Sequence, residues 1–403
     1  FTGLPGRAWW MALVVLVNRS GGMVFFFLPL YLTSQKGFSV VEAGRMVSVW
    51  GLGSLAGSYI GGWLSDRLGT KAVQAGSLAA SGAGFILLGF LDEPAVLAVA
   101  VFILSLLSES FRPATITAFA EACGEKRRAR GFTLLRLANN LGFAVGPVLG
   151  GFFAASGCYA CLFWADGLTS LAAAAVMLRL PGGGRSAARS GADARSGPSV
   201  FRDGRLLAFL GLLFCVTLMF TQIFGTWSLY LKNVRGLAES RIGLLMTANA
   251  LMIVSMEMPL MRRIERFDPL RFIRIGTVLV AMAFASLPWM DRFELVLAAT
   301  VLMTAGEMMI FSPSSAWVAG RTPPGRTGSV MGLYSLTFSL ALVVAPAAGT
   351  WSYDRLGPDA FWPAVGGLGL LAAAGFSILY RNGNGKSVQH GPAEPVEAVM
   401  TEL

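Results

Sequence analysis

The chain has 403 residues, of which 55% are hydrophobic and 13% are charged, and its formal net charge is +10. Soluble domains carry about 25% charged residues, so this composition excludes an ordinary water-soluble protein. It does not indicate a nucleic-acid partner either, because Lys and Arg are concentrated in the connections that would face one side of a membrane.

Apolar runs of about 20 residues follow one another along the chain, and each is long enough to cross a hydrocarbon layer of about 30 Å. The alternation of apolar and polar residues that is typical of membrane strands is missing from these runs. We therefore predict an all-α membrane protein with twelve transmembrane helices. The predicted helices cover residues 8–33, 43–64, 72–91, 94–120, 131–155, 158–178, 206–231, 242–261, 272–290, 293–318, 328–351 and 360–380.

A polar stretch divides these helices into six and six. Residues 181–205 are rich in Gly, Ser, Ala and Arg and predict a flexible cytoplasmic linker. The predicted domains are thus an N-terminal six-helix bundle at 1–180 and a C-terminal six-helix bundle at 206–381, followed by a disordered cytoplasmic tail at 382–403. The excess of basic residues on one side predicts a multi-pass protein of the cell (inner or plasma) membrane with both termini in the cytoplasm, in contact with membrane lipids.

The two bundles share sequence. "LYLTSQKGFSVVEAG" at 30–44 returns as "LYLKNVRGLAESRIG" at 229–243, and "VGPVLGG" at 145–151 returns as "VAPAAGT" at 344–350. Both repeats have the same spacing of about 199 residues, far beyond any solenoid period. This predicts two pseudo-symmetric halves in parallel orientation, an architecture found in many transporters.

The connection between the second and third helices carries a recognisable motif. "GGWLSDRLGTKA" at 61–72 resembles the signature loop of the major facilitator superfamily, with Thr70 where the family usually has a second basic residue. The resemblance implies the two-bundle fold and a conformational latch, in which Asp66 meets the start of helix eleven when the cavity faces outward. The matching residues are Gly62, Asp66, Arg67, Gly69 and Lys71.

The fifth helix carries a second motif. "GFAVGPVLGG" resembles the motif of the drug:proton antiporter, or exporter, branch of this superfamily, and Arg112 lies near the position of a membrane-embedded arginine in that branch. Glycines allow close helix approach and proline bends a helix, so we interpret the motif as a packing hinge. Its residues are Gly142, Gly146, Pro147, Gly150 and Gly151.

Ionisable groups inside the membrane are costly and are functional candidates by default. The resemblance places helices one, four, seven and ten around a central cavity. A carboxyl group in an apolar cavity without a basic partner can hold a proton near neutral pH, and no such partner for Glu307 is present in helix seven or ten. The proton-coupling candidates are Glu307, Glu109 and Asp166. The alternative for Glu307 is that it only positions a neighbouring helix, and the alternative for Glu109 is an ion pair with Arg112 on the same helix. Glu257 of the eighth helix is a further functional candidate, or only a buried polar anchor.

Further side chains are candidates for contact with the transported molecule. Aromatic and sulfur-containing surfaces adapt to molecules of varied shape. The cavity and substrate candidates are Arg19, Arg112, Phe26, Gln222, Trp227 and Asn139. Cys158 and Cys161 form a C-x-x-C at the outer mouth of helix six, where redox chemistry, metal binding and simple packing are all alternatives.

These features predict a monomeric secondary transporter that exports small amphipathic or drug-like molecules in exchange for protons. The alternatives are an exporter of a specific metabolite (a dipeptide, a sugar or a siderophore), a proton symporter for uptake, and coupling to Na⁺ instead of protons. The sequence has no Walker-type loop, no metal-ligand cluster and no nucleophile–base pair, so we expect no cofactor, no metal and no enzymatic activity.

Overall fold

The computed structural model describes residues 3–180, 203–264, 267–321 and 327–381. The predicted disordered tail and most of the predicted linker lie outside these residues. We call residues 3–180 the N half and residues 203–381 the C half.

The described residues form helices and no strands. The N half contains α1 (Gly6–Ser20), α2 (Val24–Gln35), α3 (Val40–Leu68), α4 (Thr70–Leu88), α5 (Pro94–Ala155) and α6 (Tyr159–Arg179). The C half contains α7 (Gly204–Phe220), the 3₁₀ helix η2 (Thr221–Phe224), α8 (Thr226–Asn233), α9 (Glu239–Ile264), α10 (Pro269–Ala285), η3 (Leu287–Trp289), α11 (Phe293–Ala319), α12 (Thr327–Leu356) and α13 (Pro358–Arg381).

Ten segments of the described chain are long and apolar enough to cross a membrane. Helices α3 and α10 run beside them and bring the crossings to twelve, as predicted. Two of the ten segments belong to α5, which is divided at Gly124 into Pro94–Gly124 and Arg130–Ala155. Gly124 has φ 64° and ψ 174°, a conformation that glycine adopts without a steric penalty, so the chain turns back there and crosses again.

The first crossing of each half is interrupted, although the apolar runs 8–33 and 206–231 predict continuous helices. In the N half, α1 ends before Gly21 and α2 begins at Val24. In the C half, η2 and Gly225 separate α7 from α8. A Cβ atom on Gly21 would lie 1.9 Å from Thr169 Oγ1, so only glycine allows α6 to approach this point of the chain so closely.

An ion pair repeats at the predicted spacing. Lys36, which follows α2, pairs with Asp92, and Arg235, which follows α8, donates to Asp291 Oδ1 at 2.5 Å. The hydrogen bond to Asp92 raises the pKa of Lys36. Because both members of each pair lie about 199 residues from their counterparts, the repeat extends from sequence to side-chain contacts.

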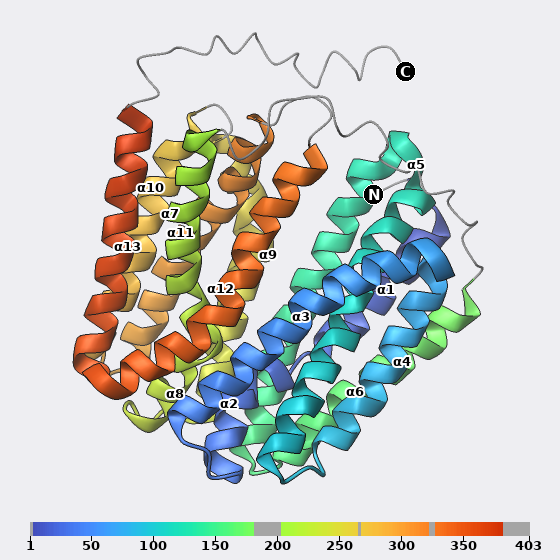
Figure 1. The fold of residues 1–403 in the computed structure, drawn as a ribbon, viewed down its shortest axis with the longest axis horizontal. Coiled ribbons are helices and arrows are strands. Elements are labelled where there is room, and N and C mark those ends of the chain that lie inside the picture. The colour runs from blue at the N-terminus through green and yellow to red at the C-terminus, as the bar shows by residue number, and fades with distance from the viewer. Residues whose placement is uncertain (1–2, 181–202, 265–266, 322–326, 382–403) are drawn as a thin grey trace.

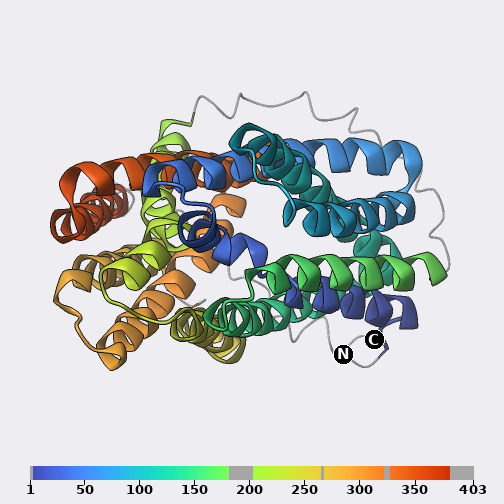
Figure 2. The same cartoon turned by 90° about the horizontal axis from the view of Figure 1, so that it is seen from below.

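The two halves contact each other mainly through two pairs of helices, α3 with α12 and α5 with α9, and also where α8 meets α2 and α3. Figure 2 shows the helices of the N half (blue to green) mainly on one side and those of the C half (lime to red) mainly on the other. In Figure 1 the halves diverge toward the upper side, where α1 begins and α13 ends. We call this the termini side and the other the opposite side.

Candidate transport cavity

A cavity of about 430 Å³ lies between the two halves. Rings from both halves form its apolar wall: Phe25 lies 5.4 Å from Trp50 and 5.2 Å from Phe224, and Phe26 lies 6.0 Å from Phe143, between ring centroids. Its polar part includes three of the predicted carboxyl groups and both predicted arginines. These residues are Arg19, Glu109, Arg112, Asp166 and Glu307.

Arg19 of α1 is held by several groups of the N half. Its Nη1 lies 3.9 Å from Glu109 Oε1, its Nε donates to Asn139 Oδ1 at 3.3 Å, and its guanidinium lies 5.3 Å from the centre of the Phe143 ring. Glu109 therefore pairs with Arg19 and not with Arg112, the partner suggested by helical spacing. Asn139 reaches the cavity only through Arg19, whereas its neighbour Asn140 lines the cavity itself.

Arg112 lines the same cavity from α5, and its side chain is exposed. Within the described residues it forms no hydrogen bond and no ion pair. Its charge acts unfavourably on the nearby guanidinium of Arg19. The cavity thus contains one arginine with partners, Arg19, and one that is accessible to a molecule bound in the cavity, Arg112.

Asp166 of α6 lies at the interruption between α1 and α2. Its carboxylate accepts hydrogen bonds from the backbone N–H of Met23 at 3.0 Å and from that of Val24 at 2.9 Å. These N–H groups begin α2 and have no partner within the helix, and the positive end of the helix dipole favours a carboxylate there. The side chain is only 2% exposed, so Asp166 stabilises the broken helix from within the protein.

Glu307 of α11 is the carboxyl group that the C half contributes to the cavity. Asn249 of α9 donates to its Oε2 at 2.7 Å and also to Thr304 at 2.9 Å. Among the described residues no cation pairs with Glu307. The sequence prediction missed Asn249, although an amide in the middle of a membrane helix is itself a signal of a polar contact between helices.

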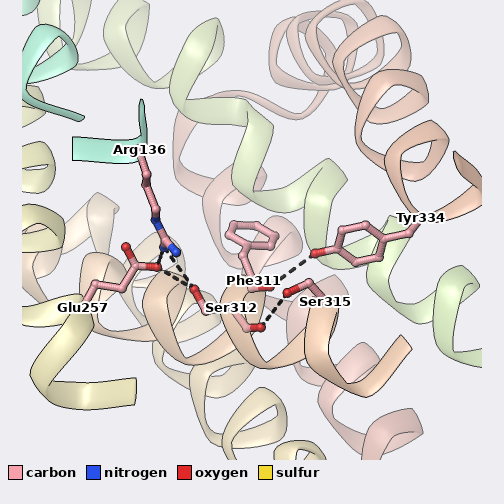
Figure 3. A network of polar contacts seen from close by, with 6 residues as sticks. All are labelled: Arg136, Glu257, Phe311, Ser312, Ser315 and Tyr334. Atoms are coloured by element: carbon pink, nitrogen blue, oxygen red, sulfur yellow. Dashed lines mark hydrogen bonds and ion pairs between the residues drawn. The ribbon is translucent and has the colours of Figure 1, made fainter. Parts of the chain in front are cut away.

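A second cavity extends from Glu307 toward the termini side. Figure 3 shows the polar contacts on its wall: Arg136 of α5 pairs with Glu257 of α9, and Ser312 of α11 donates to the same Glu257 oxygen at 2.5 Å. Glu257 was predicted either as a functional candidate or as a buried polar anchor, and Arg136 was not predicted as a site residue. The contact joins the N half to the C half beside the route from the cavity to the termini side.

Two predicted cavity residues lie away from the cavity. Gln222 of η2 donates through Nε2 to the carbonyl of Ala345 at 3.1 Å and accepts from Thr226 at 2.8 Å. Trp227 of α8 is 2% exposed within the apolar core. Gln222 therefore stabilises the interruption at Gly225 and Trp227 packs in the core, so neither lines the cavity, whereas Phe26 does.

Comparison with known proteins identifies the family of this chain. The sequence profile of the Major Facilitator Superfamily matches residues 10–238 and 209–402. The chain belongs to the major facilitator superfamily. It is a multi-pass membrane transporter, not an enzyme.

Its relatives in this superfamily are distant. The chain is 25% identical to the uncharacterized MFS-type transporter YqjV of Bacillus subtilis (strain 168), over 90% of this chain and 91% of the relative. It is 22% identical to a Na(+), Li(+), K(+)/H(+) antiporter of Planococcus maritimus, over 82% and 85%, and 22% identical to the multidrug resistance protein MdtH of Edwardsiella ictaluri (strain 93-146), over 90% and 95%.

Solved structures of the superfamily have the same fold. A POT family transporter in complex with 5-aminolevulinic acid matches with a TM-score of 0.79 at 15% identity, over 95% of this chain and 97% of that chain. The nucleoside transporter NupG matches with a TM-score of 0.77 at 14% identity, over 94% and 100%. At these identities the likeness shows the fold alone.

The superfamily loop motif lies on the termini side, between α3 and α4. Asp66 is exposed and makes no hydrogen bond or ion pair with any residue that the structure describes, and the side chains at 322–329 are outside that set. Arg67 lies 4.0 Å from the centre of the Trp63 ring, and Lys71 donates to the carbonyl of Leu178 at 2.9 Å. Gly62 has open space around it, and Gly69, with φ 86°, forms the turn between the helices. The predicted latch is therefore not engaged among these residues.

The motif of the fifth crossing lies where the halves meet on the opposite side. A Cβ atom on Gly151 would lie 2.6 Å from the carbonyl of Glu239, and one on Gly243 would lie 2.2 Å from the carbonyl of Pro147. The other motif glycines pack within the N half: Gly142 against Arg19, Gly146 against the Gly22 carbonyl, and Gly150 against Phe27. This part of α5 thus packs closely against both the broken first crossing and α9.

Cys158 and Cys161 form a disulfide at the start of α6, also on the opposite side. Between them, the Tyr159 hydroxyl donates to Glu239 Oε1 at 3.0 Å, and Lys232 pairs with the same oxygen at 2.7 Å. Because Tyr159 belongs to the N half and Glu239 to the C half, this contact helps to close the opposite side.

Proposed function

We propose that this transporter is a proton-coupled antiporter that exports small amphipathic molecules by alternating access. The observation that carries the proposal is Glu307. It lines the cavity between the halves, it receives a hydrogen bond from Asn249, and it has no cationic partner in the described part of the chain. A carboxyl group in such a place can take up and release a proton when its contact with water changes.

The names of two relatives support proton coupling and export as the direction of transport. The Planococcus protein is named a cation/H⁺ antiporter and MdtH a multidrug resistance protein, so both names agree with exchange or export. The contact that Glu307 makes is with an amide N–H, whereas hard cations need several oxygen ligands. This favours protons over Na⁺ as the coupling ion.

We infer that the termini side faces the cytoplasm, the side to which the sequence assigns the predicted linker at 181–205. The cavity then opens inward in this structure, through the second cavity beside Arg136. In the transition to the outward-open state, α3 would separate from α12 and α5 from α9 on the opposite side. The same transition would bring Asp66 to the start of α12. A conformational equilibrium can be shifted only by contacts that differ between its states, and Asp66 and Tyr159 supply such contacts.

Reconstitution in proteoliposomes tests this function. Vesicles with an imposed pH gradient are given a panel of amphipathic drugs, dipeptides, sugars and siderophores, and both substrate and proton movement are recorded. We expect Glu307→Gln to bind the transported substrate but to lose gradient-driven accumulation, because the amide fills the same space without titrating. The control is Glu294→Gln, an exposed carboxyl group on the same helix. Full proton-driven accumulation by Glu307→Gln would reject the assignment.

A further inference from the structure

The charged groups of the central cavity are not equally satisfied. Glu109 lies 3.9 Å from Arg19, Asp166 accepts two backbone N–H groups, and Glu307 accepts from Asn249. Each carboxyl group therefore has a partner within the protein. Arg19 has partners as well, in Glu109 and Asn139.

Arg112 differs from all of these. It is exposed, it lines the cavity, and it has no hydrogen bond or ion pair with the described residues. An arginine among membrane helices is costly unless water or a counter-charge meets it. Its guanidinium has five donors in a planar fork, which is suited to a carboxylate, sulfonate or phosphate.

The space in front of Arg112 is largely aromatic. Phe25, Phe26 and Trp50 of the N half and Phe220 and Phe224 of the C half line the same cavity. Phe224 lies 5.2 Å from Phe25 and 5.9 Å from Phe26, so the apolar wall is continuous from one half to the other. A molecule that fills this space needs an apolar, preferably aromatic, body.

The position of Arg112 also fits the route of entry. It lies three residues after Glu109, which is about 4.5 Å along the helix axis toward the termini side. A molecule that comes from that side would meet Arg112 before it meets the pair of Arg19 and Glu109.

We propose that the substrate is an amphipathic organic anion, whose anionic group binds Arg112 while its apolar body lies against the aromatic wall. The inference rests on the proposed function, because it takes the cavity ligand to be the transported molecule. It narrows the substrate class from amphipathic molecules in general to those with an acidic group, and it makes Arg112 the residue that determines specificity.

Three probes that share one ring system test the proposal: 2-naphthoate, 2-naphthamide and 2-naphthylmethylamine, which are anionic, neutral and cationic. Their binding to the purified full-length protein in detergent is measured by calorimetry without any gradient. We expect 2-naphthoate to bind tightest. Arg112→Gln should weaken 2-naphthoate about tenfold or more and change 2-naphthamide by less than about twofold. The affinity of Arg112→Lys for 2-naphthoate should lie between those of the wild type and Arg112→Gln, because Lys keeps the charge but loses the planar fork of donors.

The control variant is Arg274→Gln, since Arg274 lies beside Tyr380 away from the cavity and its loss should change none of the affinities. Unchanged binding of 2-naphthamide also shows that Arg112→Gln is folded. The proposal is wrong if 2-naphthoate does not bind, if the amide or the amine binds as tightly, or if Arg112→Gln leaves 2-naphthoate unaffected. Because no proton gradient is used, these outcomes are independent of proton coupling.

Discussion

Arg136 of α5 pairs with Glu257 of α9, and the two residues belong to different halves of the transporter. The Glu257 side chain is 9% exposed, whereas that of Arg136 is 53% exposed. The contact is therefore asymmetric: the carboxylate depends on its partners, while the guanidinium also has access to water.

This asymmetry predicts unequal effects of the two neutral substitutions. Arg136→Gln leaves a buried carboxylate without its cation, and the loss of one partner of a buried charge is more costly than the loss of both charges. Glu257→Gln removes the buried charge and keeps an oxygen that Ser312 can donate to. We expect Arg136→Gln to destabilise the protein by about 1–3 kcal/mol and Glu257→Gln by less.

Thermal unfolding of the purified variants in detergent measures the difference. Arg274→Gln, which removes an arginine beside Tyr380 away from the interface between the halves, is the control for the loss of one positive charge. A melting temperature for Glu257→Gln at or below that of Arg136→Gln would contradict the prediction.

Asp66 makes no hydrogen bond or ion pair with the described residues, so Asp66→Asn should not destabilise the state seen in this structure. If the proposed latch forms in the other state, the substitution removes a contact of a carboxylate with a helix start that is worth about 0.3–1 kcal/mol when exposed. We expect the ratio of the state open on the termini side to the state open on the opposite side to rise about two- to fivefold. Spin labels at Leu68 and Phe267, both exposed on that side, should show a larger share of the longer label-to-label distance. Identical distance distributions for Asp66→Asn and the wild type would argue against the latch, and Asp354→Asn is the control.

Tyr159→Phe should shift the same equilibrium in the other direction. It removes a hydrogen bond between the halves on the opposite side, to a carboxylate that is 6% exposed. Hydrogen bonds to charged groups contribute about 1.5–3 kcal/mol, so the population open on the opposite side should rise clearly. The labels at Leu68 and Phe267 should then report more of the short distance. A change in the same direction as Asp66→Asn would show that Tyr159 does not hold the opposite side closed.

Features with a period or a repeat could be predicted from the sequence. The twelve crossings follow from apolar runs, and the repeat of Tyr31 as Tyr230 extends to the pairs of Lys36 with Asp92 and Arg235 with Asp291. The charges that the resemblance places around one space, Arg19, Glu109, Arg112 and Glu307, do line one cavity. Hydropathy and the internal repeat are sufficient for the crossings and the two halves, whereas the shared cavity was expected from the family resemblance. The charges were candidates because lipid penalises a charge that has no role or partner.

Partners across helices could not be predicted in this way. Asn249 is 58 residues from Glu307 and Arg136 is 121 residues from Glu257, and only the packing of the halves brings them together. The interruptions of the first and seventh crossings were missed because hydropathy does not register a break in the helix. The Gly21–Gly22 pair and Gly225 were the available signals. Gln222 and Trp227 were assigned to the cavity, whereas neither of them lines it.

Asp166 and Glu307 allow a direct test of which carboxyl group of the cavity has a structural role and which couples transport to protons. It accepts the N–H groups of Met23 and Val24 at the start of α2, so Asp166→Asn places an amide where only acceptors are useful and should cost about 1–3 kcal/mol of stability. The melting temperature should fall, whereas the surviving protein should still couple transport to the pH gradient in proteoliposomes. The opposite pattern is expected for Glu307→Gln, which should keep its stability and lose coupling. If Asp166→Asn melts like the wild type but no longer responds to the gradient, Asp166 carries the proton and Glu307 does not.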